Sequence, residues 1–215
     1  MTMLVRAITV GPFQENSYLV MDEQSRDAVL IDPGDEAARL LAEVDRAGAQ
    51  LRALWITHGH IDHIGAIAAV LRRWPVPVRL HALDRPLYDR GASQAAHYGL
   101  PFEQPPVPDG EFTEGDGLAV GSLHFTVMHV PGHAPGHVAF VGEGAVFGGD
   151  CLFAGSVGHS DLPLSDPAAL EQSLERFVSL PGDTVVYPGH GPATTVAAER
   201  AGNPFLNGAA RIARR

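Results

Sequence analysis

The sequence has a single cysteine, no long hydrophobic run and a minority of basic residues. One cysteine among 215 residues cannot form an internal disulfide, so nothing here requires an oxidising compartment. No apolar run approaches the roughly 20 residues that span a bilayer, and the N-terminus lacks the regions of a signal peptide. Because 25 acidic residues outnumber 15 basic ones, a general nucleic-acid surface is also disfavoured. We therefore expect a cytoplasmic protein that binds neither nucleic acid nor membrane.

Hydrophobic residues make up 45% of the chain, which is enough for a core, and the length suits one domain over residues 1–215. Helical spacing of apolar residues predicts helices over 37–47 and 65–74, and Asp166-Pro167 resembles the start of a third. Short β-like runs occur in both halves of the chain, over residues 4–10, 16–21, 28–34, 51–57, 78–82, 123–130, 138–141, 145–149 and 184–187. This mixture predicts two sheets with helices outside them.

Residues 91–117 are rich in glycine, proline and polar groups, and they predict a long surface loop. A plain connector is the simpler interpretation of this segment. A wall of an active site is the alternative, since long loops in compact domains are often functional.

The segment THGHIDH (57–63) places three imidazoles and a carboxylate within six residues. His58 and His60 lie two residues apart at the end of a predicted strand, so their side chains point the same way. Asp62 and His63 follow at the predicted turn or first helical residues. All four groups are ligands for borderline divalent metals, and this crowding indicates a metal site.

Further donors come from three turns that are distant in the sequence. VPGHAPGH (130–137) contains His133 and His137, GGDCLF (148–153) contains Asp150, and VVYPGHG (185–191) contains His190. Each turn follows a β-like run and contains glycine, which is where a rigid scaffold presents side chains to a site.

These motifs, in this order, resemble the metallo-β-lactamase superfamily, and within it the glyoxalase II group of thioester hydrolases. THGHIDHIGA, PGHAPGH, GDCLFAGS and YPGHGPAT all fit that group, and ERAGNPFL (199–206) is similar to the ending of its short, single-domain branch. The resemblance implies an αββα sandwich with metals at one edge of the two sheets. It also implies two divalent ions, with zinc favoured and iron or manganese possible. The implied ligand sets are His58, His60 and His133 for one ion and Asp62, His63 and His190 for the other, with Asp150 as the bridge.

The resemblance implies a dinuclear hydrolase that cleaves a thioester, such as S-lactoylglutathione or a related acyl-thiol, with a metal-bound hydroxide. Asp62 and Asp150 would position that hydroxide as metal ligands. His159 stands where the group has a lysine that grips glutathione, and the chain leaves no room for the further C-terminal helical domain of larger members. His159 is therefore a candidate substrate contact, while the identity of the thiol carrier stays open. A mononuclear-iron persulfide dioxygenase of the same fold and a broad ester or lactone hydrolase are the alternatives, and either a monomer or a homodimer is expected.

Two residues are expected to support the ligands. His137 is expected to orient a ligand from behind, and Asp32 in IDPG (31–34) either does the same or caps a turn. Cys151 directly follows Asp150, so it should point to the opposite face of the strand and lie buried as a small apolar residue.

Overall fold

The first half of the chain forms a six-stranded mixed sheet. The computed structural model describes residues 2–213, and the strands of this sheet follow the order β1-β2-β3-β4-β5-β6. Neighbours from β3 to β6 run parallel, while β1, β2 and β3 are antiparallel. The strands are β1 (Met3–Val10), β2 (Glu15–Asp22), β3 (Asp27–Ile31), β4 (Gln50–Trp55), β5 (Val78–His81) and β6 (Gly110–Phe112).

The second half forms another six-stranded sheet with the order β14-β13-β10-β9-β8-β7. Its strands are β7 (Gly117–Val120), β8 (Leu123–His129), β9 (Val138–Gly142), β10 (Ala145–Gly149), β13 (Val185–Pro188) and β14 (Thr194–Thr195), and a separate hairpin joins β11 (Leu152–Phe153) to β12 (Ser156–Val157). Because β8 and β13 both run in the direction of β10, the carboxyl ends of these three strands meet at one edge.

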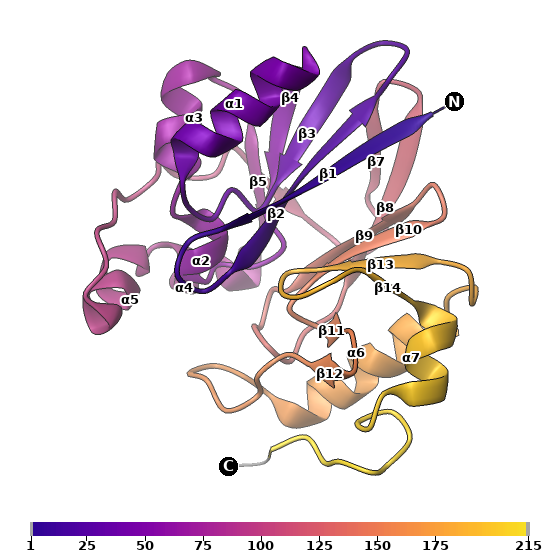
Figure 1. The fold of residues 1–215 in the computed structure, drawn as a ribbon. Coiled ribbons are helices and arrows are strands. Elements are labelled where there is room, and N and C mark those ends of the chain that lie inside the picture. Colours follow the sequence, from indigo (N-terminus) through magenta and orange to yellow (C-terminus); the bar gives the residue numbers. More distant parts are fainter. Residues whose placement is uncertain (1, 214–215) are drawn as a thin grey trace.

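Helices cover the outer face of each sheet. Figure 1 shows α1 and α3 outside the first sheet and α6 and α7 outside the second. The helices are α1 (Ala37–Ala47), α2 (Ile61–Ile64), α3 (Ile67–Arg73), α4 (Arg85–Tyr88), α5 (Gly91–Tyr98), α6 (Pro167–Ser179), α7 (Val196–Gly202) and the 3₁₀ helix η1 (Ala82–Asp84). None of them, within residues 2–213, is both long and apolar enough to cross a membrane.

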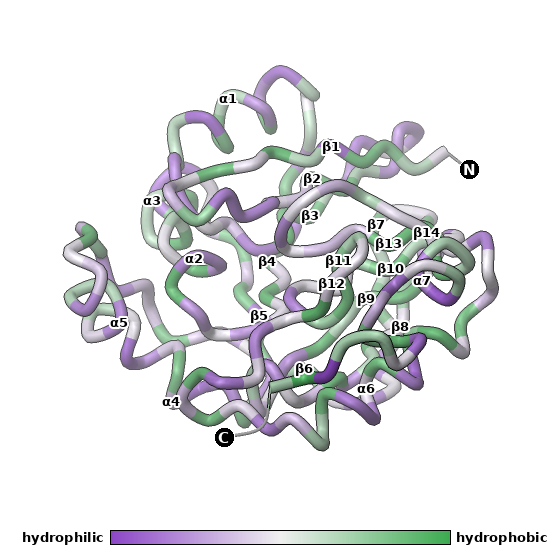
Figure 2. The backbone as a smooth tube through the Cα atoms, turned by 60° about the horizontal axis from the view of Figure 1, so that its bottom comes forward, coloured by the Kyte–Doolittle hydropathy of each residue, from purple (hydrophilic) through white to green (hydrophobic). Residues whose placement is uncertain are grey.

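The alternation of side chains along the strands produces the layers. In β2, Leu19 and Met21 pack beneath α1 and α3, while Tyr18 and Val20 face the second sheet. In β10, Val146 packs under α6 and α7 instead, in a cluster with Leu174 and Phe177. Figure 2 shows hydrophobic green stretches along the inner strands and alternating purple and green on α1. Since successive strand residues face opposite sides, each sheet buries both faces, and the expected four-layer αββα sandwich is confirmed.

The sequence located α1, α3, α6 and the longer strands, but it did not indicate α4, α7, β7 or the short strands β11, β12 and β14. Helix α6 begins as expected, because the Asp166 carboxylate accepts hydrogen bonds from the N–H groups of Ala168 and Ala169 and Pro167 occupies the first turn.

The interpretation of residues 91–117 as one long loop was wrong, because this segment contains α5 and β6. Helix α5 buries only Gly91 and Ala95, so it lacks a strong apolar stripe. Strand β6 is only three residues long and exists through parallel pairing with β5.

Candidate metal centre and substrate cavity

The seven predicted metal ligands gather at one end of the sandwich, although they come from both halves of the chain. His58 and His60 follow β4, and Asp62 and His63 lie in the short helix α2. His133 follows β8, while Asp150 and His190 follow β10 and β13 directly or after one glycine. The carboxyl ends of strands thus deliver all of these side chains to one edge, where ligands commonly bind in α/β sheets.

Three histidines form the first donor group. One ring nitrogen of each of His58, His60 and His133 lies within 4.8 Å of the others. The Nδ1 atom of His60 is 2.9 Å from Nε2 of His133. The two rings can share a proton across this contact, and without that proton both nitrogens are free to bind a cation.

The second donor group contains Asp62, His63 and His190, which also lie within 4.8 Å of one another by one donor atom each. Asp150 lies between the two groups. Its Oδ1 is 3.5 Å from Nε2 of His63, and its Oδ2 is 3.6 Å from Nε2 of His133 and 3.3 Å from Nε2 of His190. One carboxylate therefore contacts both groups, as a bridging ligand would.

Four of the imidazoles are oriented by an acceptor at Nδ1. The acceptors are Thr57 Oγ1 for His58 at 3.0 Å, Asp32 Oδ2 for His63 at 3.0 Å, the carbonyl of His159 for His133 at 2.8 Å, and the carbonyl of Phe13 for His190 at 3.1 Å. Thr57 can accept because its own hydroxyl donates to Asp32 at 2.6 Å. These acceptors favour a proton on Nδ1 of each ring, so it is Nε2 of each ring that faces the site and becomes free to bind a metal.

The donor atoms at the centre have no other use in the fold. His58 Nε2, His63 Nε2 and Asp150 Oδ1 are buried and find no hydrogen-bond partner among residues 2–213. An unpaired buried polar atom is costly, and coordination of a cation would satisfy all three. The donor set of imidazoles and carboxylates fits a borderline divalent metal in both groups.

The two groups differ in their electrostatics. Burial, together with the neighbouring imidazoles, lowers the pKa of His58 well below its usual value and lowers the pKa of His60 to about 3. Burial also opposes protonation of His63 and His190, but carboxylates of Asp62 and Asp150 outweigh it and raise both pKa values, that of His190 to about 10. The first group thus offers neutral nitrogen donors, while the second has an excess of negative charge that favours a cation.

Asp32 and His137 lie behind the donors. Asp32 is 2% exposed and accepts hydrogen bonds from the backbone N–H of Thr57 at 2.7 Å and from His63. Its carboxylate therefore positions His63 and Thr57. The N–H of Gly34 in the Asp-Pro-Gly turn bonds the Ser17 hydroxyl instead. Nε2 of His137 accepts a hydrogen bond from the backbone N–H of Asp150 at 3.2 Å, so this ring contacts the loop of the bridging residue.

A cavity of about 1030 Å³ opens in front of the donors. His159 lines it, but its side chain is 77% exposed and contacts Asp161, while its backbone carbonyl holds His133. The role of His159 as a substrate contact stays a prediction, and the sequence did not indicate the contact of its carbonyl with His133. The other lining residues, given together, are Phe13, His60, Ile61, Asp62, Leu87, Arg90, Ser93, Gln94, His97, Tyr98, His133, Asp150, Phe153, Ser156, Val157, Asp161, Leu162, Pro163, Leu164 and His190.

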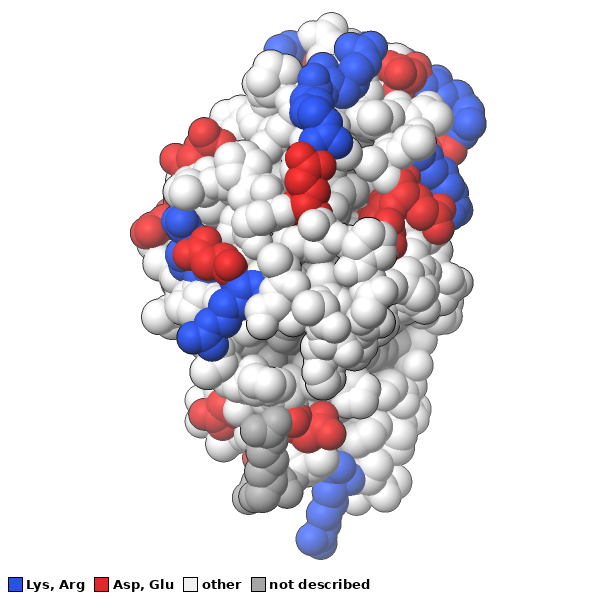
Figure 3. Space-filling view, turned by 90° about the vertical axis from the view of Figure 1, so that its left-hand side faces the viewer, with Lys and Arg blue, Asp and Glu red and all other residues white. Residues whose placement is uncertain are grey.

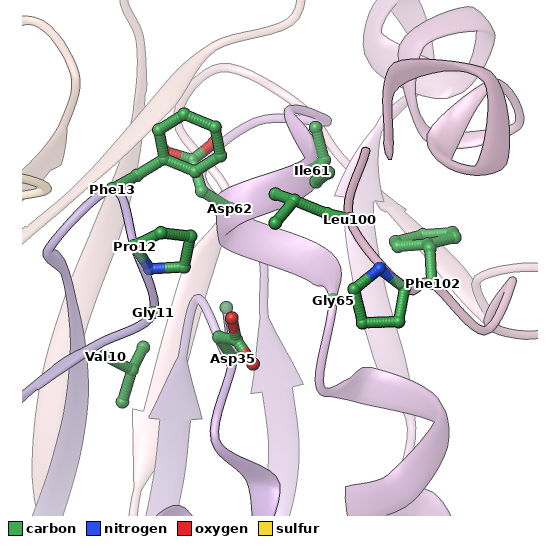
Figure 4. A pocket seen from close by; sticks show the side chains of 12 residues that line it. Val10, Gly11, Pro12, Phe13, Asp35, Ile61, Asp62, Gly65, Leu100 and Phe102 are labelled. Atoms are coloured by element: carbon green, nitrogen blue, oxygen red, sulfur yellow. The ribbon is translucent and has the colours of Figure 1, made fainter. Parts of the chain in front are cut away.

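A second, much smaller pocket of about 50 Å³ adjoins the site. Figure 4 shows Phe13 and Asp62 at one end of it and Val10 and Asp35 at the other. Since one water needs about 10–15 Å³ of such space, this pocket suits a few waters rather than a substrate.

Sequence reasoning missed several residues that support the site. Glu15 is buried with Oε1 4.0 Å from Nδ1 of His63, and burial raises the pKa of its carboxyl well above the usual value. Gln94 of α5 donates to the carbonyl of Gly59 and accepts from the N–H of Ile61. Neither residue belongs to a local motif, and only the helical spacing of α5 could have indicated Gln94.

The expected burial of Cys151 is confirmed. It is 0% exposed in the apolar cluster under α6 and α7, and burial raises the pKa of its thiol. A buried, protonated thiol is a poor nucleophile.

Comparisons with known proteins agree with this geometry. A sequence model of the family described as the metallo-beta-lactamase superfamily matches residues 10–190. The hydroxyacylglutathione hydrolase GloC of Haemophilus influenzae is 36% identical over 210 residues, covering 95% of this chain and 99% of that protein.

Two solved structures extend the likeness. TTHA1623, crystallised in a di-iron-bound form, superposes with a TM-score of 0.87 at 48% identity, covering 94% of this chain and 100% of that one. The BLEG-1 B3 metallo-beta-lactamase superposes with a TM-score of 0.89 at 36% identity, covering 94% and 99%.

Proposed function

The chain belongs to the metallo-beta-lactamase superfamily, and from that premise we propose that it is a dinuclear-metal hydrolase that cleaves thioesters of small acyl-thiols. The observation that carries the proposal is the convergence of three oriented imidazoles on one carboxylate that contacts both donor groups. The Nε2 atoms of His63, His133 and His190 all lie within 3.6 Å of an Asp150 carboxylate oxygen. The similarity to a hydroxyacylglutathione hydrolase over nearly the whole chain supports the thioester.

His58, His60 and His133 would hold one ion, and Asp62, His63 and His190 the other, with Asp150 shared. When bound, two divalent ions lower the pKa of a water molecule and polarise a carbonyl oxygen. Zinc is our expectation, and the di-iron form of a similar protein makes iron the second choice.

The residues of the chain would orient the metal ligands. Asp32 and the His159 carbonyl keep the Nδ1 protons of His63 and His133 in place, so both rings present a lone pair. The cavity has room for an acyl-thiol against the donors. Since Cys151 is buried, no covalent step on a cysteine is needed.

The test uses protein stripped of metal and reloaded separately with zinc, iron or manganese. We expect two ions per chain and release of free thiol from S-lactoylglutathione or a related thioester. His58→Ala and Asp150→Ala should lose turnover by more than the roughly 10–100-fold typical of residues behind metal ligands. His124→Ala, which removes an exposed histidine far from the donors, is the matched control.

The competing activities are measured on the same samples. One iron per chain, with oxygen uptake on a thiol persulfide and no thioester cleavage, would identify a persulfide dioxygenase instead. Faster turnover of lactones, simple esters or a β-lactam than of every thioester would also overturn the substrate assignment.

A further inference from the structure

Helix α5 forms one wall of the large cavity. Figure 1 shows it standing away from the two sheets, and Ser93, Gln94, His97 and Tyr98 line the cavity from one face of it. The Gln94 side chain ties this wall to the metal-ligand turn, because it bonds the carbonyl of Gly59 at 3.1 Å and the N–H of Ile61 at 3.2 Å. The wall is therefore held at a fixed position relative to the donors.

Arg90 precedes this helix, one turn before Gln94, so the two residues are about 6 Å apart along the axis. It is the one lysine or arginine that lines the cavity, and the chain contains no lysine. Arg90 is exposed, and among the residues that the structure describes no hydrogen-bond or ion-pair partner contacts its side chain. Arg85, five residues earlier, instead pairs with Asp89 at 2.7 Å.

The position of Arg90 is unfavourable for the helix itself. It occupies the N-cap of α5 and makes no side-chain capping bond there, and a cation at a helix N-terminus opposes the helix dipole. An unpaired guanidinium kept at such a place suits an external anion. Its planar set of N–H donors matches a carboxylate in two parallel bonds.

Apolar side chains line the same cavity near the other end of α5, where Tyr98 lies about 12 Å from Arg90 along the helix axis. Phe13 and Tyr98 contact each other with ring centroids 5.0 Å apart, and together with Leu164 they are exposed by 37%, 52% and 53%. Figure 4 shows the Phe13 ring beside Asp62, so this apolar surface reaches the donors. A ligand that carries both an apolar stretch and an anion matches these two features.

We propose that Arg90 is the anion subsite of the cavity and selects acyl-thiols that carry a carboxylate several bonds from the thioester. The selection of thioesters in this inference rests on the proposed thioesterase function. The binding of a carboxylate at Arg90 rests on the cavity alone. The carboxylate can belong to the thiol or to the acyl group.

A binding experiment separates the subsite from the reaction. The probe is 3-(hexylthio)propanoate, a thioether without a thioester or ester bond, and its neutral counterpart is the primary amide, both titrated calorimetrically into the metal-loaded protein. Arg90→Gln should weaken binding of the carboxylate relative to the amide by about tenfold or more, as expected for a lost hydrogen bond to a charged group. Arg85→Gln, which removes the same charge outside the cavity, should leave that ratio unchanged.

Kinetics then identify the side that carries the anion. Three thioesters are compared: acetyl-3-mercaptopropionate, the glutaryl thioester of 2-mercaptoethanol, and the neutral acetyl thioester of 2-mercaptoethanol. A fall of about tenfold in the kcat/KM preference for either charged thioester over the neutral one supports Arg90 as the subsite and shows which side it contacts. Unchanged preferences and an unchanged binding ratio in Arg90→Gln overturn the proposal. If the wild type cleaves no thioester, the proposed function fails, and the thioether titration still decides the role of Arg90.

Discussion

At the residue scale, two neighbours in the chain have opposite roles. Asp150 faces the donor groups, whereas Cys151 is 0% exposed in the cluster under α6 and α7. We predict that Cys151→Ala keeps turnover and metal content near those of the wild type. The free energy of unfolding should fall by only about 1 kcal/mol, the loss expected for one small buried group.

Turnover, metal content and a urea denaturation curve check this prediction. Asp150→Asn is the comparison, because it changes the preceding residue and should lose metal. Loss of all activity in Cys151→Ala with both ions still bound would show that the thiol takes part in the reaction.

At the scale of elements, the short helix η1 connects two ligand turns. Its last residue, Asp84, is fully buried and accepts hydrogen bonds from the N–H of Gly59, at 2.7 Å, and from the N–H of Gly136. Gly59 lies between His58 and His60, and Gly136 directly precedes His137. Burial raises the pKa of the Asp84 carboxyl to about 6 in spite of both bonds.

We predict that Asp84→Ala weakens metal binding by about 10–100-fold, because both turns lose their common anchor. The two buried N–H groups that are left unpaired should also cost about 2 kcal/mol or more of stability. Competition with a chelator measures the affinity, and Asp89→Ala at an exposed site is the control. If Asp84→Ala is less stable but binds metal as tightly as the wild type, Asp84 stabilises the fold and does not position the metal ligands.

At the scale of the whole molecule, the two sheets are joined at both ends. Near the site, Asn16 of β2 bonds the carbonyls of Pro188 and Gly191 around His190. At the opposite end of β2, the Asp22 carboxylate accepts from the N–H and the hydroxyl of Ser122, at 2.7 and 2.8 Å, in the turn before β8. On the face in Figure 3, blue and red side chains are interleaved around a broad uncharged area, without a large patch of one sign.

The hydrogen bonds between Asp22 and Ser122 should make the free energy of unfolding depend on pH. Hydrogen bonds from Ser122 and Gln24 lower the pKa of Asp22 from 3.8 to about 2. A carboxyl whose pKa is lower in the folded state than in the unfolded state stabilises the fold fully when the pH is above its unfolded-state pKa. This stabilisation is lost as the pH falls through its folded-state pKa. We therefore predict that Asp22→Asn is less stable than the wild type at pH 7, and that the difference shrinks between about pH 4 and pH 2.

Urea midpoints at pH 7, 4, 3 and 2 measure this difference. Asp45→Asn, which removes a carboxylate from an exposed pair on α1, controls for the general effect of charge. A difference between wild type and Asp22→Asn that stays constant down to pH 2 would contradict the linkage.

Much of the fold and of the donor set could be predicted from the sequence, because both depend on patterns of residues that are close together in the chain. The alternation in β2 and β10, the helical spacing of α1 and the Asp166-Pro167 cap each depend on residues close in the chain. The four histidine- and aspartate-bearing turns resemble a known family for the same reason, and the seven donors meet in the structure.

Only the tertiary structure decided what surrounds those donors. The carbonyl of His159 behind His133, the Asp84 link between two turns, and the unpaired Arg90 in the cavity all depend on segments distant in sequence. Helix α5 escaped prediction because its position depends on Gln94 contacts with the ligand turn rather than on an apolar stripe of its own. Local sequence patterns determine which elements form and which side chains can bind metal. The orientation of those side chains and the lining of the cavity depend on packing between segments that are distant in the sequence.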